Sequence, residues 1–384
     1  MTNGAVFTTY NGHYVLMHII NDKAMHIYAY GSLEGGNIGR IINCRVEKGT
    51  GIDASFVRYS AKESGFINRD LKNGSRVALM YKKDPTAGKR ACFTDKISIT
   101  GKYAVVIDDD PFVKCSSKAV NSKKNEYIDH FGETAHRLHT GLIIRTQAFN
   151  EDDGMAKADE EISRIHDLIN AVKEKSAHTP DYTVLYCPLP DFINDIRYLI
   201  DQGIEEIVTD DESIMSALKK TYEDAGGPVN VTDRVGLRFY DDKLLSVTAL
   251  YAFGAKISEA LSRKVYLKSG GYITIDTTEA LTAVDVNTAS LKPSGSASDN
   301  FRKINTEAAD EIARQIVLRN LSGIIIIDFI NMKSDMDYAD LKSRLELLFK
   351  KDRISCRFVD FTKLGLCEVT RKREGVRLSE IFYD

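Results

Sequence analysis

Two acidic residues, Asp285 and Asp328, stand at the ends of predicted strands in the C-terminal part of this 384-residue chain. Asp285 lies in the run 281–286, Asn287 follows just beyond it, and Asp328 closes the apolar run 324–327. Carboxylate and amide oxygens are the hard ligands that Mg²⁺ prefers, with water and phosphate completing its coordination. These three residues therefore predict a Mg²⁺ site. The alternative is that each aspartate only caps a turn or a helix.

The elements that must position these side chains are a hairpin and a strand–helix–strand unit. Residues 265–275 predict the hairpin, because Gly270 and its neighbours supply the positive φ of a tight turn. Residues 301–319 carry apolar side chains every three or four positions, as in an amphipathic helix. The run 324–327 is wholly apolar, which is typical of a strand buried on both faces of a parallel sheet. Since strands joined by a crossover helix are parallel, 281–286 and 324–327 should present their carboxyl ends at one edge, where ligands bind.

Three blocks in this region resemble the signature of the ribonuclease E/G family: TEALTAVDVN, NTEAADEIARQIVLRN and GIIIIDFINM. The resemblance implies that Asp285 and Asp328 coordinate a catalytic Mg²⁺, with Asn287 matching the family's nearby asparagine. It implies an endoribonuclease that hydrolyses single-stranded RNA to 5′-phosphate and 3′-hydroxyl ends, in the processing and decay of rRNA or mRNA. The last histidine of the chain is His178. The predicted catalytic module thus holds no histidine, which favours a metal-activated water over histidine-based cleavage.

The resemblance also implies an α/β, multidomain (α+β) fold. An RNase H-like scaffold is interrupted by an OB-fold RNA-binding domain of the ribosomal S-one type and by a 5′-sensor, and a DNase I-like catalytic module follows. The expected boundaries are 1–34 with 191–260 for the scaffold, 35–115 for the OB-fold, 116–190 for the sensor and 261–384 for the catalytic module. The residue pattern supports the OB-fold on its own, because 35–115 reads as about five short strands, which suits a small barrel.

Aromatic and basic residues interleave in the predicted barrel. OB-folds bind single strands by stacking bases on aromatic rings inside a basic groove. The resemblance makes Phe56 and Phe66 the RNA-facing aromatics and Lys89 a basic RNA contact. Taken singly, each aromatic residue, Phe93 included, could equally be barrel core.

An Arg-Thr pair, Arg145 and Thr146, follows the short apolar run 141–144. In the family this segment binds the terminal 5′-phosphate of RNA, which stimulates cleavage. The chemistry suits that role, because the planar guanidinium matches a phosphate and threonine adds a hydroxyl. A second basic feature is the stretch 342–377, which predicts a phosphate-tracking surface.

Composition predicts a cytoplasmic protein that does not enter the membrane. The chain has no apolar run near the length of a membrane span and no evident signal peptide. Its six cysteines are scattered without a CxxC pair. The CPxC motif through which longer family members share zinc is absent, and Cys356 and Cys367 lie in apolar runs, as small buried hydrophobes do. We expect no zinc, and a monomer or a dimer that is not linked by zinc.

A second hypothesis is an RNA-binding protein of the same fold without turnover, or with weak activity. It rests on departures from the family pattern, among them Ala289 in place of the glycine of NTG and Asn331 in place of an acid. The intact Asp285 and Asp328 favour an enzyme.

Overall fold

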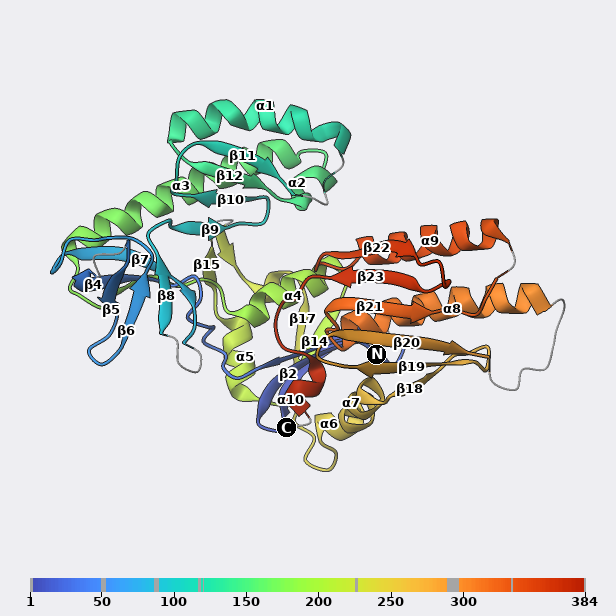
Figure 1. The fold of residues 1–384 in the computed structure, drawn as a ribbon. Coiled ribbons are helices and arrows are strands. Elements are labelled where there is room, and N and C mark those ends of the chain that lie inside the picture. The colour runs from blue at the N-terminus through green and yellow to red at the C-terminus, as the bar shows by residue number, and fades with distance from the viewer. Residues whose placement is uncertain are drawn as a thin grey trace. The chain divides into compact units, whose positions relative to one another are not determined.

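The computed structural model describes residues 3–49, 53–85, 90–116, 119, 121–224, 227–288, 297–332 and 334–382, which form two compact units (Figure 1). The first unit is assembled from Met1–Gly31, Asp195–Leu218 and Arg234–Asp384. The second unit comprises Ser32–Asn194 and Lys219–Asp233. The chain therefore starts in the first unit, builds the second, and returns twice.

A five-stranded barrel forms one part of the second unit. Its strands are β4 (Ile41–Gly49), β5 (Ser55–Arg58), β6 (Ser64–Ile67), β7 (Arg76–Lys83) and β8 (Ala91–Thr94). They join in the order β4-β5-β6-β8-β7, and β7 pairs back with β4 to close the ring. The core inside is apolar and includes Val57, Leu79, Tyr81 and Phe93. The small OB-like barrel expected from the sequence is confirmed.

A second sheet, with three helices, forms another part of that unit. Its order is β11-β12-β10-β9. The strands are β9 (Ser98–Thr100), β10 (Ala104–Ile107), β11 (Phe112–Cys115) and β12 (Gly141–Ile144), and the helices are α1 (Asn121–Leu138), α2 (Thr146–Asn150) and α3 (Gly154–His178). Residues 98–115, which the sequence pattern grouped with the barrel, thus supply three strands of this second sheet instead. The apolar faces of α1 and α3 pack on this sheet and give it a separate core.

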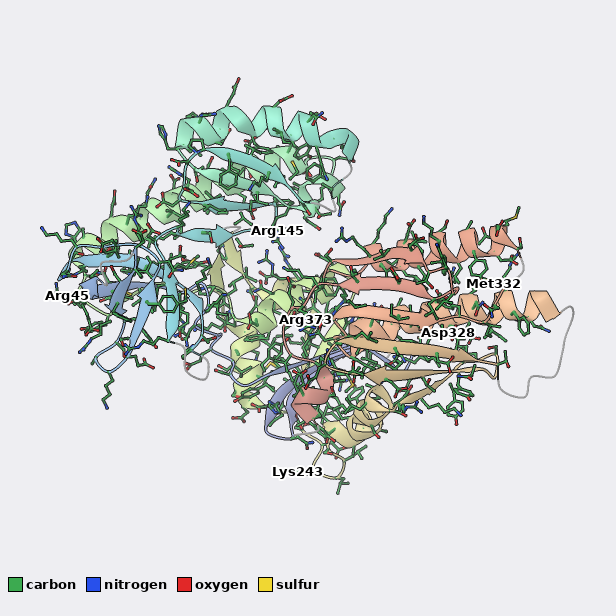
Figure 2. The ribbon with its side chains drawn as sticks, in the orientation of Figure 1. Arg45, Arg145, Lys243, Asp328, Met332 and Arg373 are labelled. Atoms are coloured by element: carbon green, nitrogen blue, oxygen red, sulfur yellow. The ribbon has the colours of Figure 1, made fainter. Side chains whose placement is uncertain are left out.

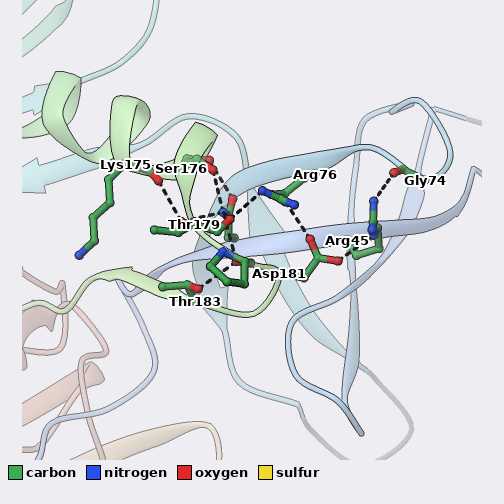
Figure 3. Close-up of polar contacts among 10 residues, drawn as sticks. Arg45, Gly74, Arg76, Lys175, Ser176, Thr179, Asp181 and Thr183 are labelled. Carbon is green, nitrogen blue, oxygen red and sulfur yellow. Dashed lines mark hydrogen bonds and ion pairs between the residues drawn. The ribbon is translucent and has the colours of Figure 1, made fainter.

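A buried polar joint fixes the barrel to the end of α3 (Figure 3). The fully buried Asn43 of β4 donates from Nδ2 to the carbonyl oxygens of Ser176 (2.9 Å) and Thr179 (3.1 Å), and accepts from the Ser176 hydroxyl at 2.8 Å. Beside it, Asp181 accepts from Arg45 at 2.9 Å and from Arg76 at 2.8 Å. Strand β13 (Val184–Tyr186) then extends the barrel sheet next to β4.

The first unit contains two sheets, of which one joins distant parts of the chain. Its order is β17-β14-β1-β2-β3. The strands are β1 (Asn3–Tyr10), β2 (His13–Ile20), β3 (Lys23–Tyr30), β14 (Glu206–Thr209) and β17 (Gly236–Phe239). Strand β1 is parallel to β14, with Gly4 opposite Glu206. The connecting helices are α4 (Asp191–Asp201), α5 (Glu212–Lys219), α6 (Val247–Leu250) and α7 (Phe253–Leu261). Helix α10 (Leu378–Phe382) also belongs to this unit, whereas β15 (Tyr222–Asp224), β16 (Gly227–Val229) and a 3₁₀ turn (Val231–Asp233) belong to the second unit.

The other sheet of the first unit has the order β18-β19-β20-β21-β23-β22. Its strands are β18 (Lys264–Tyr266), β19 (Tyr272–Thr277), β20 (Leu281–Asn287), β21 (Gly323–Asp328), β22 (Cys356–Phe361) and β23 (Cys367–Arg371). Helix α8 (Ala297–Leu318) connects the parallel strands β20 and β21, and α9 (Asp335–Lys350) follows β21 (Figure 1). The predicted hairpin and the strand–helix–strand unit are both confirmed.

The prediction that residues 324–327 are buried on both faces is wrong. Ile325 and Ile327 are completely buried beneath α8 and α9, whereas Ile324 is 52% exposed. The reason is that α8 and α9, the helices that follow β20 and β21, both pack on the face that carries Ile325 and Ile327. We call the uncovered side of this sheet the open face.

Among the described helices, none has the length and apolar character needed to cross a membrane.

Candidate functional site

Asp285 and Asp328 lie side by side on the open face. Alternation along β20 buries Val284 and Val286 and leaves Asp285 exposed between them. In the parallel ladder the register partner of Asp285 is Asp328, at the carboxyl end of β21 (Figure 2). Neighbouring strands are about 4.8 Å apart, and register partners in a parallel pair point to the same side. The two carboxylates therefore form one row, open to solvent.

Asn287 belongs to the same site. Its Nδ2 donates a hydrogen bond of 2.7 Å to Oδ2 of Asp285, two residues earlier on the same face of β20. This bond orients the carboxylate, and the amide oxygen of Asn287 is a third oxygen atom beside the pair that could bind a metal.

A neighbouring acid on the open face, Asp276, has a partner of its own. Arg263 binds both oxygens of Asp276, at 2.5 and 2.7 Å, and this interaction lowers the pKa of Asp276. Across the described residues, no group of three or more histidine, cysteine, aspartate or glutamate side chains is placed to hold a metal. The site thus offers two carboxylates and one amide. That donor set suits Mg²⁺, which keeps several of its waters, better than it suits structural zinc, which needs four protein ligands.

Two residues of α8 hold the loops around the site, and the sequence reasoning did not single them out. The buried Asn305 donates to the carbonyl of Ile330 at 2.7 Å and accepts from its N–H at 3.1 Å, which fixes the chain just after Asp328. Glu307 accepts the N–H groups of Lys268 (2.5 Å) and Ser269 (3.0 Å) in the β18–β19 turn. Burial raises the pKa of Glu307, but the hydrogen bonds from this turn lower it and prevail. Both residues lie in the sequence NTEAA, within one of the blocks that resemble the family signature, and this resemblance is the feature of the sequence that could have identified them.

A glycine is required where the hairpin meets the site. A Cβ atom on Gly271 would lie 2.8 Å from the carbonyl oxygen of Asn287, closer than real Cβ contacts allow. Gly271 therefore lets β19 approach the end of β20 that carries Asn287.

Cys356 and Cys367 lie in the core between the sheet and its helices. Burial raises the pKa of Cys367 to about 12. A thiol of this kind stays protonated at neutral pH, whereas zinc binds the thiolate.

In the barrel, Phe56 and Phe66 are directly opposite each other on β5 and β6, outside the apolar core. Phe56 is 36% exposed, and the guanidinium of Arg90 lies 5.2 Å from the centre of its ring. Phe93, by contrast, is buried in the core. The third predicted RNA contact, Lys89, lies outside the described residues.

Arg145 and Thr146 lie where β12 ends and α2 begins. The exposed Arg145 donates to the carbonyl of Gly101, and the hydroxyl of Thr146 is 2.8 Å from that of Ser116 (Figure 2). The cation and the hydroxyl are thus adjacent at the end of one strand, in the second unit.

Known proteins resemble this chain over most of its length. The sequence model of the Ribonuclease E/G family matches residues 98–374. Ribonuclease E of Synechocystis is 31% identical over 84% of this chain and 47% of its own length. Ribonuclease E of Escherichia coli is 28% identical over 86% of this chain and 33% of its own length. Ribonuclease G of the same organism is 31% identical over 80% of this chain and 61% of its own length. The chain spans about half the length of the first of these relatives. With the family match covering well over half of its residues, the chain belongs to the ribonuclease E/G family.

Proposed function

We propose that this protein is a Mg²⁺-dependent endoribonuclease that hydrolyses single-stranded RNA to 5′-phosphate and 3′-hydroxyl ends, in RNA processing and decay. The observation that carries the proposal is the register pairing of Asp285 with Asp328 on an open face, with Asn287 bonded to Asp285. The names of the relatives, ribonuclease E and ribonuclease G, supply the substrate class.

Each residue of the site has a distinct part in this reaction. Asp285 and Asp328 would hold Mg²⁺, which supplies Lewis acidity toward a phosphate and lowers the pKa of a bound water. Asn287 holds the Asp285 carboxylate in position. In the described part of the chain α8 and α9 pack on the opposite face and both aspartates are exposed, so an extended strand of RNA can reach the two carboxylates.

The other predicted sites would bind the same RNA. In this proposal the barrel is an OB-fold whose Phe56, Phe66 and Lys89 contact bases and backbone, and Arg145 with Thr146 binds the terminal 5′-phosphate. The sheet of β1 and β14 corresponds to the RNase H-like scaffold, and the sheet of β20 and β21 to the DNase I-like module.

The test is incubation of the purified protein with an end-labelled single-stranded RNA, in Mg²⁺ and in EDTA. We expect cleavage in Mg²⁺ only, with products that carry 5′-phosphates and can be ligated through their 3′-hydroxyls. Tight binding with no cleavage in any divalent metal would instead support an RNA-binding protein without turnover. Products with 2′,3′-cyclic phosphates would contradict the hydrolytic mechanism.

Phe56→Ala combined with Phe66→Ala is expected to weaken RNA binding and leave the fold intact. Each stacked base contributes about 1–3 kcal/mol, and neither ring belongs to the barrel core. An RNA titration without metal, together with a melting curve, measures both effects.

The matched control is Phe93→Ala, which removes a buried ring from the same barrel. It should cost about 3–5 kcal/mol of stability. Unchanged RNA affinity in a folded Phe56, Phe66 double variant would refute the stacking role.

A further inference from the structure

A row of two tyrosines leads directly to the candidate metal site. Along the open face, Tyr266 of β18 is opposite Tyr272 of β19, and Tyr272 is opposite Asn287 of β20. Asn287 in turn donates to Asp285. Because register partners in an antiparallel pair share a face, all four side chains lie on the open side of the sheet.

The aromatic row is exposed. Tyr266 is 72% exposed, more than any other aromatic side chain in the described part of the chain. The two rings are 6.3 Å apart and tilted by 58°. Leaving such a ring in water forgoes the favourable burial of its apolar surface. A binding partner that covers the ring recovers that free energy.

A lysine completes the cluster. The ammonium of Lys264 lies 3.6 Å from the centre of the Tyr272 ring and 4.8 Å from that of Tyr266. The next row of the same face runs from Lys264 through Thr274 to Asp285 and Asp328. The backbone of Lys264 therefore lies in the row of the two carboxylates, while its ammonium lies over the aromatic rings of the neighbouring row.

These features together fit a nucleotide better than a protein surface. A base stacks on an aromatic ring whatever its sequence, and a nearby cation contacts the backbone phosphate. A protein interface would need about 800 Å² of complementary surface on each partner, whereas the face beyond the tyrosines carries the charges of Arg263, Asp276 and Asp285.

We infer that Tyr266, Tyr272 and Lys264 form a stacking platform that holds the nucleotide next to the scissile phosphate. The base lies on the exposed ring of Tyr266, and Lys264 contacts the adjoining phosphate. Holding this nucleotide fixes where the backbone crosses Asp285 and Asp328, so the three residues are positioning residues. The inference rests on the proposed function, because it takes single-stranded RNA as the substrate.

The test uses a fluorescent base to find which nucleotide of the RNA stacks on the protein. A series of short single-stranded RNAs, each with one 2-aminopurine at a different position, is titrated with the protein in EDTA. In the wild type we expect stacking to quench one or two positions that flank the bond cut when Mg²⁺ is added, in addition to any positions that stack on Phe56 and Phe66. Tyr266→Ala should abolish that quenching and raise KM about 5- to 100-fold. Tyr266→Phe, which retains the ring, should restore both.

Two controls separate stacking from general damage. Phe239→Ala removes another exposed aromatic ring of the same unit, on β17, and should change neither quenching nor KM. Melting curves confirm that each variant is folded. Quenching that persists beside the cut in folded Tyr266→Ala overturns the platform, as does a wild type that quenches no position near the cut. Cleavage by the wild type in Mg²⁺ is a separate measurement. Its absence would contradict the proposed function and not the stacking platform.

Discussion

Asp285→Asn and Asp328→Asn are each expected to abolish RNA cleavage while RNA binding and folding remain. Either change removes one of the two charges that would hold Mg²⁺, and leaves a side chain of nearly the same shape. A metal supplies several kcal/mol of transition-state stabilisation, so the loss in kcat should be about 10²- to 10⁴-fold. Both side chains are exposed register partners. Since like charges that are opposite each other destabilise a sheet, either variant should melt at or slightly above the wild-type temperature.

Single-turnover cleavage at saturating Mg²⁺, with a binding titration in EDTA, measures the effect. Asp276→Asn is the matched control, because Asp276 is an acid on the same face that Arg263 already binds. It should keep most of the wild-type rate. Near-normal cleavage by Asp285→Asn or Asp328→Asn would show that the metal site lies elsewhere.

Arg371→Met and Asp352→Asn are each expected to destabilise the first unit strongly. Arg371 of β23 is buried, and its Nε donates to Asp352 at 2.7 Å. Its Nη1 donates to Oδ1 of Asn320 at 2.7 Å and to the carbonyl of Leu321 at 2.9 Å. The side chain thus ties β23 to the ends of α8 and α9. Removing one member of a buried ion pair costs about 3–5 kcal/mol.

Denaturant unfolding measures this cost. The double variant should be less destabilised than the sum of the single variants, because both single changes remove the same ion pair. Lys372→Met is the control: its pair with Glu374 is exposed, and its loss should change stability by less than about 1 kcal/mol. An Arg371→Met variant as stable as Lys372→Met would contradict the structural role.

The alternation of apolar residues was enough to predict the centre of the site. Val284 and Val286 on either side of Asp285, and the helical period of α8, predict two parallel strands with both aspartates at one edge. The same pattern could not reveal that the sheet has an open face. Four consecutive isoleucines look alike in sequence, and their burial depends on which elements pack against each side.

Residues whose role depends on distant partners were beyond the reach of sequence pattern. Arg371 looked like one member of a basic surface, but its partner Asp352 and the end of α8 enclose it. Phe56 and Phe93 both alternate within short barrel strands, and only the closed ring shows which one faces outward. Asn305 lies in a block that resembles the family signature, yet only the structure shows that its side chain donates to the carbonyl of Ile330, just after β21.

The pairing of β1 with β14 has a consequence for how the chain is made. Residues 4–8 of β1 are all buried, and the edge that pairs with β14 is filled by residues 206–208. At a synthesis rate of about 5–20 residues per second, roughly 200 residues take about 10–40 s to follow. Until then the β1–β3 hairpins expose an apolar strand edge of the kind that templates aggregation. The nascent chain is therefore most prone to aggregate while the second unit is being synthesised. Slower translation of that unit lengthens the time for which the edge of β1 is exposed.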